Sequence, residues 1–134
     1  MVVSPVEGAD ILQCVKEYPR IAAAFLWAAS RDEAMVVEHL VNVGRRSALE
    51  RTAHFFMELA ERLSLVEMAE AHEFQCPLSQ YELADALGLS SIHVNRILRE
   101  LRECELVTVS RGTVKIHDLS RLRQLSGFQG GYLS

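Results

Sequence analysis

Three features of the sequence predict a mainly α-helical fold with a small β hairpin. The stretch from Arg20 to Val43 contains neither Pro nor Gly and is rich in apolar residues, which favours one long helix. Further along, residues 79–101 place apolar side chains at helical spacing on both sides of a glycine. Two runs rich in β-branched residues then flank Ser110-Arg111-Gly112, a pattern typical of a hairpin. We therefore expect a long helix followed by a compact helical domain with a β wing.

The composition excludes several classes of protein. The 134 residues are 49% hydrophobic and 24% charged, which suits one small folded domain plus a long helix rather than a large catalytic fold. No apolar run approaches the roughly 18 to 20 residues of a membrane span, and the N-terminus lacks the pattern of a secretory signal. The sequence therefore predicts a cytoplasmic protein with no membrane partner.

The cysteines and histidines form no pattern of a metal or catalytic site. Cys14, Cys76 and Cys104 are odd in number and far apart, so neither a disulfide framework nor a zinc site is expected. The histidines are scattered, and no paired carboxylate, phosphate-binding loop or metal-ligand spacing accompanies them. They are His39, His54, His72, His93 and His117. We expect no metal site, no cofactor bound by these residues and no enzymatic activity.

Charge is distributed unevenly along the chain. Residues 1–76 carry seven Lys and Arg against twelve Asp and Glu, whereas residues 77–134 carry seven against six. Between Gly88 and Leu125, seven basic residues stand against four acidic ones, a local net charge of +3 in a chain whose net charge is −4. Phosphate groups respond to the local field, so this segment is a candidate for contact with nucleic acid.

The N-terminal region is expected to hold a short helix and a long one. The short helix should end near Glu17, with Ser4 as a candidate cap before Pro5. Pro19 separates it from the Arg20–Val43 helix, which is apolar nearly all round. A second copy of the chain would cover such a helix, and a central core helix of a monomer is the alternative. The expected dimerisation residues are Ile21, Phe25, Ala28 and Met35.

The segments after the long helix are predicted from local patterns. Gly44 predicts a bend, and the next helix is expected from about Ser47 to Leu63. Residues 73–76 alternate polar and apolar in the manner of a short strand. The hairpin strands are expected at residues 106–109 and 113–116, and a closing helix at 118–125.

The most specific pattern lies between residues 77 and 98. Ser79 is a candidate cap for a first helix, and Ser90 or Ser91 for a second. The pattern also contains a small residue where the helices cross and a glycine for the positive φ of a tight turn. Two inward apolar residues complete it. These residues are Ala84, Gly88, Val94 and Ile97. Together they predict a winged helix-turn-helix.

The second helix of such a motif enters the major groove of duplex DNA by its N-terminal end. Its outward residues are Ser91, Ile92, His93, Asn95, Arg96 and Arg99. Arg96 is the strongest candidate to read a base, because its fork can donate to both acceptors of guanine. A solvated arginine, or a pair with Glu100, is the alternative. Asn95 would contact adenine or phosphate.

Three residues outside the second helix complete the predicted contacts with DNA. They are Ser79, at the start of the first helix, and Arg111 and Lys115, on the hairpin. A wing can bring such cations to the phosphate backbone, although the same charges would be unremarkable on any exposed hairpin.

The chain resembles the C-terminal part of a Crp/Fnr-family transcription regulator. Residues 40–51 resemble the end of the family's dimerisation helix and the start of its next helix, and residues 77–98 resemble its helix-turn-helix. Residues 116–119 and 128–133 resemble one bacterial subgroup's ending. The resemblance implies a homodimer on a two-fold related DNA site, with RNA polymerase as a further partner. It divides the chain into an N-terminal part, 1–44, and a winged helix-turn-helix domain, 45–134.

Two departures limit what the resemblance implies. The family's N-terminal sensor domain, which binds a cyclic nucleotide or another effector, is not among these residues, so a fragment or a truncated regulator is expected. The best-known members carry a glutamate at the position of Ile92, so their DNA sequence preference does not transfer. The alternative function is a protein-interaction module in which the arginines pair with nearby glutamates and the helix-turn-helix is only a packing unit.

Overall fold

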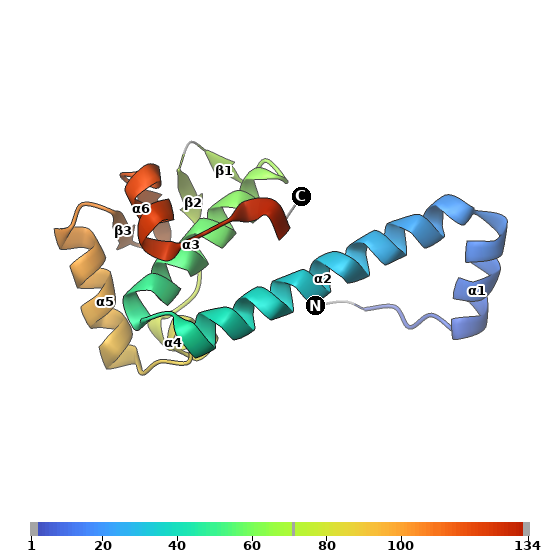
Figure 1. Cartoon of the computed structure of the whole chain (residues 1–134), viewed down its shortest axis with the longest axis horizontal. Coiled ribbons are helices and arrows are strands. Elements are labelled where there is room, and N and C mark those ends of the chain that lie inside the picture. Colours follow the sequence, from blue (N-terminus) through green and yellow to red (C-terminus); the bar gives the residue numbers. More distant parts are fainter. Residues whose placement is uncertain (1–2, 71, 133–134) are drawn as a thin grey trace. The chain divides into compact units, whose positions relative to one another are not determined.

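The computed structural model describes residues 3–70 and 72–132 of the chain. It divides into two compact units, Met1–Val36 and Val37–Ser134, each of which is described by itself. No helix among the described residues combines the length and the apolarity that crossing a membrane requires. Figure 1 labels the elements along the chain.

Helix α1 (Gly8–Glu17) and most of helix α2 (Pro19–Arg45) make up the first unit. Both helices were expected, and the end of α1 at Glu17 is confirmed. The predicted cap at Ser4 is wrong, because the N-cap position of α1 is Glu7 and no side chain there accepts a hydrogen bond from the helix. The backbone from residue 3 to residue 7 is not helical, so Ser4 lies too far from the first turn to cap it.

Helix α2 continues through Gly44 to Arg45, so the bend predicted at this glycine is wrong. The guanidinium of Arg51 explains how the helix end is held, since it donates hydrogen bonds to three main-chain oxygens there, at 3.1 to 3.4 Å. These oxygens belong to Asn42, Val43 and Arg46. The last carbonyls of a helix have no partner within it, and Arg51 supplies one. A glycine inside a helix is then tolerated at a modest cost.

Helix α3 (Ala48–Ser64) is the centre of the second unit and confirms the helix predicted from Ser47 to Leu63. A capping box fixes its start: the Glu50 N–H donates to Ser47 Oγ at 3.3 Å, and the Ser47 N–H donates to the Glu50 carboxylate at 2.7 Å. The hydrogen bond from the Ser47 backbone holds the pKa of the Glu50 carboxyl below its usual value.

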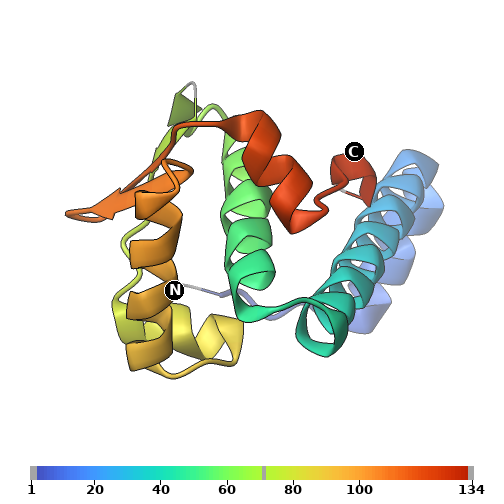
Figure 2. The same cartoon turned by 60° about the vertical axis from the view of Figure 1, so that its left-hand side comes forward.

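Three helices pack against α3 in the second unit: α4 (Gln80–Leu87), α5 (Ser91–Glu103) and α6 (Leu119–Ser126). Figure 2 shows α3 running between α5 and α6. Side chains that are at most 2% exposed fill the space between these helices. They are Ala53, Phe56, Met57, Leu87, Val94, Leu101 and Leu122. The closing helix predicted at residues 118–125 is confirmed as α6, and a short 3₁₀ turn (Gly130–Tyr132) follows it.

In the described part of the chain, four strands form one antiparallel sheet in the order β1-β2-β4-β3. They are β1 (Ala69–Glu70), β2 (Glu73–Gln75), β3 (Val107–Ser110) and β4 (Thr113–Ile116). The predicted hairpin is therefore confirmed as β3 and β4, and β2 confirms the short strand expected at residues 73–76. Arg111 and Gly112 form the two-residue turn of the β3–β4 hairpin. Their φ values of 51° and 77° are both positive, as the central positions of such a turn require.

A polar ring joins the end of α2 to α3 within the second unit. Arg46 Nη1 donates to Asn42 Oδ1 at 2.8 Å, and Asn42 Nδ2 lies 2.9 Å from Nδ1 of His54. His54 Nε2 lies 3.1 Å from Glu38 Oε1, which lies 2.7 Å from Arg46 Nη2 and closes the ring. Because the amide oxygen accepts from Arg46, the amide nitrogen donates to His54 Nδ1, which requires a neutral imidazole.

The buried imidazole of His54 makes the stability of the protein depend on pH. Burial lowers the pKa of His54 from its usual 6.5, and the nearby Arg46 lowers it further, against the opposing effect of Glu38 and Glu58. In the unfolded chain His54 therefore binds a proton near pH 6.5, whereas in the folded chain it binds one only at a lower pH. We expect the free energy of unfolding to fall as the pH drops below 6.5, by at most about 1.4 kcal/mol per pH unit. Urea titrations between pH 7.5 and 5.5 measure this slope.

The His54→Gln variant tests the assignment of this slope. It should be less stable than the wild type at pH 7.5, and its free energy of unfolding should change less between pH 7.5 and 5.5. The matched control is His117→Gln, which removes an exposed histidine and should keep the wild-type slope. The carboxyls of Glu50 and Glu82 have lowered pKa values and affect stability only below their usual 4.5, outside this window. An unchanged slope in His54→Gln would contradict the assignment.

Candidate DNA-binding interface

Helix α4 begins with a second capping box, and this confirms Ser79 as its cap. The Glu82 N–H donates to Ser79 Oγ at 3.3 Å, and the Ser79 N–H donates to the Glu82 carboxylate at 2.8 Å. Hydrogen bonds with the side chain and the backbone of Ser79 lower the pKa of the Glu82 carboxyl. The cap fixes the direction of the first residues of α4, while contact of Ser79 with DNA stays a prediction.

The turn between α4 and α5 has the geometry that the sequence predicted. Gly88 takes φ of 64° and ψ of 38°, and the next residue returns a hydrogen bond from its N–H to the Ala84 oxygen at 2.9 Å. Arg51 donates to the Leu87 oxygen at 2.7 Å, so the same guanidinium that caps α2 also caps α4. Ser90, one of the two serines considered, is the cap of α5, because its Oγ accepts from the His93 N–H at 3.2 Å.

Helix α5 turns its apolar residues inward as predicted. Val94, Ile97 and Leu101 are buried, and Leu98 is half-buried. The residues predicted to face DNA lie on the outer side: Ile92, Asn95, Arg96 and Arg99 are exposed, and Ser91 and His93 are half-buried. Ile92 is 82% exposed, so its side chain is available for contact with a partner.

Two of these outward residues are held by side-chain hydrogen bonds. Asn95 Nδ2 donates to Gln80 Oε1 at 2.8 Å, which links α5 to the first residue of α4. Arg96 Nη2 lies 2.9 Å from His93 Nε2, one turn earlier on the same helix. Among the residues that the structure describes, Arg96 forms no salt bridge with Glu100, the pairing considered as an alternative.

An open cavity with a volume of about 460 Å³ lies beside these residues, where the start of α4, the outer side of α5 and strand β3 meet. Its lining consists of Gln80, Asn95, Leu98, Arg99, Arg102 and Val109. Two guanidinium groups and two amides offer many N–H donors and positive charge, which suits a phosphate group. Helical spacing does not reveal which residues of α4 lie next to α5, so Gln80 was not predicted, and Arg102 was counted only as part of the local positive charge.

The wing carries the two other predicted cations. Arg111 is exposed and lies in the turn at the tip of the hairpin. Lys115 Nζ lies 3.6 Å from Glu73 Oε2 on the neighbouring strand β2, with both side chains at least half exposed. Such an exposed pair is weak, so Glu73 reduces the local positive charge without holding Lys115 in place. This neighbour could not be predicted from local patterns, since the pairing of β2 with β4 joins residues about forty positions apart.

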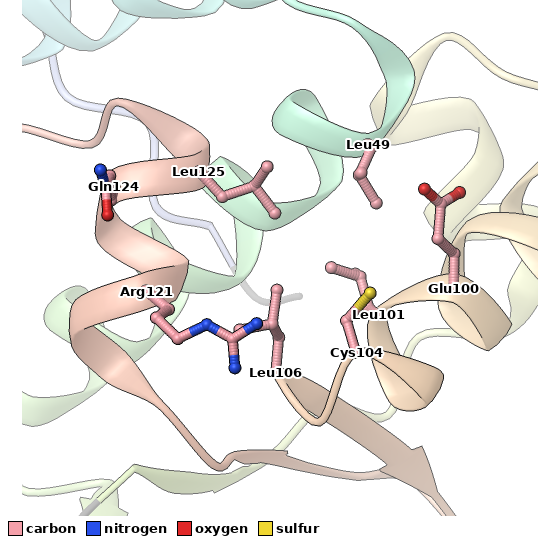
Figure 3. Close-up of a pocket in the computed structure, with 8 residues that line it drawn as sticks. All are labelled: Leu49, Glu100, Leu101, Cys104, Leu106, Arg121, Gln124 and Leu125. Atoms are coloured by element: carbon pink, nitrogen blue, oxygen red, sulfur yellow. The ribbon is translucent and has the colours of Figure 1, made fainter.

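A separate apolar cavity with a volume of about 310 Å³ lies between the start of α3, the end of α5 and α6 (Figure 3). Leucines make up half of its lining, which is Leu49, Glu100, Leu101, Cys104, Leu106, Arg121, Gln124 and Leu125. It shares no residue with the cavity between α4, α5 and β3. Within residues 3–70 and 72–132, no group of three or more His, Cys, Asp or Glu side chains is placed to hold a metal ion.

The predicted dimerisation residues lie on α2. Phe25 and Ala28 are exposed, and Ile21 and Met35 are half-buried in the single chain. Other large apolar side chains of the helix are exposed by more than half: Leu26, Trp27, Val36, Val37, Leu40 and Val43. Much apolar surface of this helix is thus uncovered in one copy of the chain.

A helix-turn-helix followed by a β hairpin, with arginines on the outer side of the second helix, defines a winged helix-turn-helix protein of the nucleic-acid-binding type. The family description that matches residues 50–125 is that of the Crp-like helix-turn-helix domain. The chain belongs to this family, whose members are Crp/Fnr-type transcription regulators.

Individual relatives agree with this membership. The nitrogen fixation regulation protein FixK of Azorhizobium caulinodans is 36% identical over 109 residues, which are 80% of this chain and 44% of that protein. FixK of Bradyrhizobium diazoefficiens is 29% identical over 112 residues, 84% of this chain and 47% of that protein. The solved structure of FixK2 from Bradyrhizobium japonicum superposes with a TM-score of 0.75 at 25% identity, over 92% of this chain and 61% of that one. The chain spans about half the length of the curated relatives it matches.

Proposed function

We propose that this chain binds duplex DNA in a sequence-dependent manner as the DNA-binding part of a Crp/Fnr-type transcription regulator. The observation that carries the proposal is the arrangement around α5: Arg96 faces outward near its start, and the cavity that Arg99 and Arg102 line lies further along the same helix. In this proposal Arg96 reads a base in the major groove, while the cavity holds a backbone phosphate.

The proposed functional unit is a homodimer that forms along α2. The uncovered apolar side chains of that helix support it, because a second copy would remove them from water. Two copies would present two recognition helices to a two-fold related site, with half-sites about 34 Å apart, one turn of DNA. RNA polymerase is a further proposed partner, and the cytoplasm is the proposed location. Catalysis has no part in the proposal.

No cofactor is assigned to these residues. In a full-length relative, a cyclic nucleotide or another effector is expected to bind a separate sensor domain and to shift the population of DNA-binding conformations.

The test is a fluorescence-anisotropy titration of labelled duplexes at two salt concentrations. One duplex is selected from a random pool by the wild-type chain, and the other has a random sequence. The logarithm of the association constant should fall linearly with the logarithm of the salt concentration, with a slope of roughly 0.9 per neutralised phosphate. Arg96→Ala should weaken binding to the selected duplex by about tenfold or more, since one bidentate base contact contributes about 1 to 3 kcal/mol of discrimination.

Two further variants sharpen the test. Arg99→Ala should weaken binding to both duplexes alike and reduce the salt slope by about one. Arg62→Ala, which removes an arginine from α3 that pairs with Glu58, should leave binding unchanged. Absence of binding to either duplex at low salt would reject the proposal and favour a protein-interaction module.

A further inference from the structure

The contact between Arg96 and His93 defines the state of both side chains before any DNA is bound. Their nitrogens, Arg96 Nη2 and His93 Nε2, lie 2.9 Å apart. A guanidinium only donates hydrogen bonds, so Nε2 of the imidazole accepts and its proton lies on Nδ1. The backbone of His93 is itself fixed, because its N–H donates to the Ser90 cap at 3.2 Å. The imidazole is thus a half-buried acceptor anchored at the first turn of α5.

This contact orients Arg96 without cancelling its charge. A carboxylate partner would hold the guanidinium but would also neutralise it and compete with the base for its donors. A neutral imidazole engages one N–H of Nη2 and leaves the other N–H groups of the fork available. Since His93 precedes Arg96 by three residues, the contact directs the guanidinium toward the N-terminal end of α5, which is the end that enters the groove in motifs of this kind.

We propose that His93 is a positioning residue for base recognition, in that it holds the Arg96 guanidinium in its reading orientation before DNA binds. This inference rests on the proposed function and specifies how that site obtains its discrimination. A free arginine side chain samples many rotamers, and immobilising it on binding costs about 0.5 to 1.5 kcal/mol. His93 removes part of this cost in advance. The neighbouring Asn95 differs, because it is bonded to Gln80 of α4 rather than to the base-reading arginine.

The contact itself is tested by ¹⁵N NMR of the chain in the absence of DNA. The imidazole ¹⁵N shifts of His93, measured where the ring is neutral, should report the Nδ1–H tautomer in the wild type. They should move toward the Nε2–H tautomer in Arg96→Ala, where no donor faces Nε2. An Nε2–H tautomer in the wild type would overturn the proposal, whether or not the chain binds DNA.

The role in discrimination is tested by the ratio of dissociation constants for a random duplex and for the duplex selected by the wild-type chain. His93→Ala should lower this ratio about fivefold, mainly through weaker binding to the selected duplex. His93→Gln, whose amide oxygen can accept from Arg96, should restore most of the ratio. Asn95→Ala, the control, should weaken binding to both duplexes equally, because Asn95 lines the proposed phosphate cavity.

A double-mutant cycle separates positioning from a general structural effect. In the Arg96→Ala background, the His93→Ala change should alter the ratio by less than about twofold, since no guanidinium remains to be oriented. An equal loss in both backgrounds, or no loss in either, would overturn the proposal. If the wild type bound no duplex, the proposed function would fail first, and the tautomer measurement would still decide whether the contact exists.

Discussion

Replacing Arg51 with methionine should lower the free energy of unfolding by about 3 kcal/mol, because one guanidinium serves the ends of two helices. It donates to main-chain oxygens at the end of α2 and to the Leu87 oxygen at the end of α4. Methionine keeps the apolar stem but leaves these acceptors without their donor. Arg51→Lys should recover only part of the loss, since the compact ammonium of lysine lacks the planar fork of donors with which Arg51 reaches both helix ends. Urea denaturation at pH 7.5 measures both variants.

The matched control for Arg51 is Arg62 on the same helix. Its side chain is 49% exposed and forms a single i,i+4 pair with Glu58 at 3.3 Å. Glu58 is buried but also lies 3.4 Å from His39 Nε2, so the loss of the half-exposed Arg62 in Arg62→Met should shift the urea midpoint less than Arg51→Met does. Equal losses for the two arginines would contradict the capping role of Arg51.

Phe56→Ala should cost about 3 to 5 kcal/mol, the range typical of a large aromatic side chain removed from a packed core. Phe56 is 0% exposed and lies on α3, the helix against which α4, α5 and α6 pack. That loss is comparable to the entire stability of a small domain, so thermal unfolding followed by circular dichroism should show a chain that is partly unfolded at 37 °C. Phe56→Leu, which leaves a smaller cavity, should retain a cooperative transition.

An exposed aromatic residue provides the comparison for Phe56. Tyr81 on α4 is 76% exposed, and its replacement by alanine should change the free energy of unfolding by less than about 0.5 kcal/mol. A large loss in Tyr81→Ala would mean that exposure in the single chain is a poor guide to packing in the folded protein.

Local patterns in the sequence were sufficient for most of the fold. The caps at Ser79 and Ser90, the positive φ of Gly88 and the glycine-containing turn of the hairpin each follow from the requirements of a few neighbouring residues. Helical spacing was sufficient to decide which side of α5 is buried. The outward residues therefore lie where they were predicted, while their contacts with DNA and the dimer contacts of α2 stay predictions.

What the sequence did not reveal depends on residues that are far apart in the chain. The bond between Asn95 and Gln80, the pairing of β2 with β4 and the capping of α2 by Arg51 all join segments whose proximity only the fold creates. Strand β1 has two residues, too few for any alternation to be visible. The wrong bend at Gly44 has the same origin: the glycine was read from its own conformational freedom, without the side chain that holds the carbonyls around it.

Arg51 and the polar ring also restrict movement of the backbone at the end of α2. Gly44 is exposed, but it lies between Asn42 and Arg46, and both of these residues are hydrogen-bonded to side chains of α3, so its backbone is held on either side. We expect the last turn of α2 and the helix-turn-helix to move as one body, because Arg51 is hydrogen-bonded to the ends of both α2 and α4. Replacing Arg51 should therefore loosen the hold of the end of α2 on the helix-turn-helix.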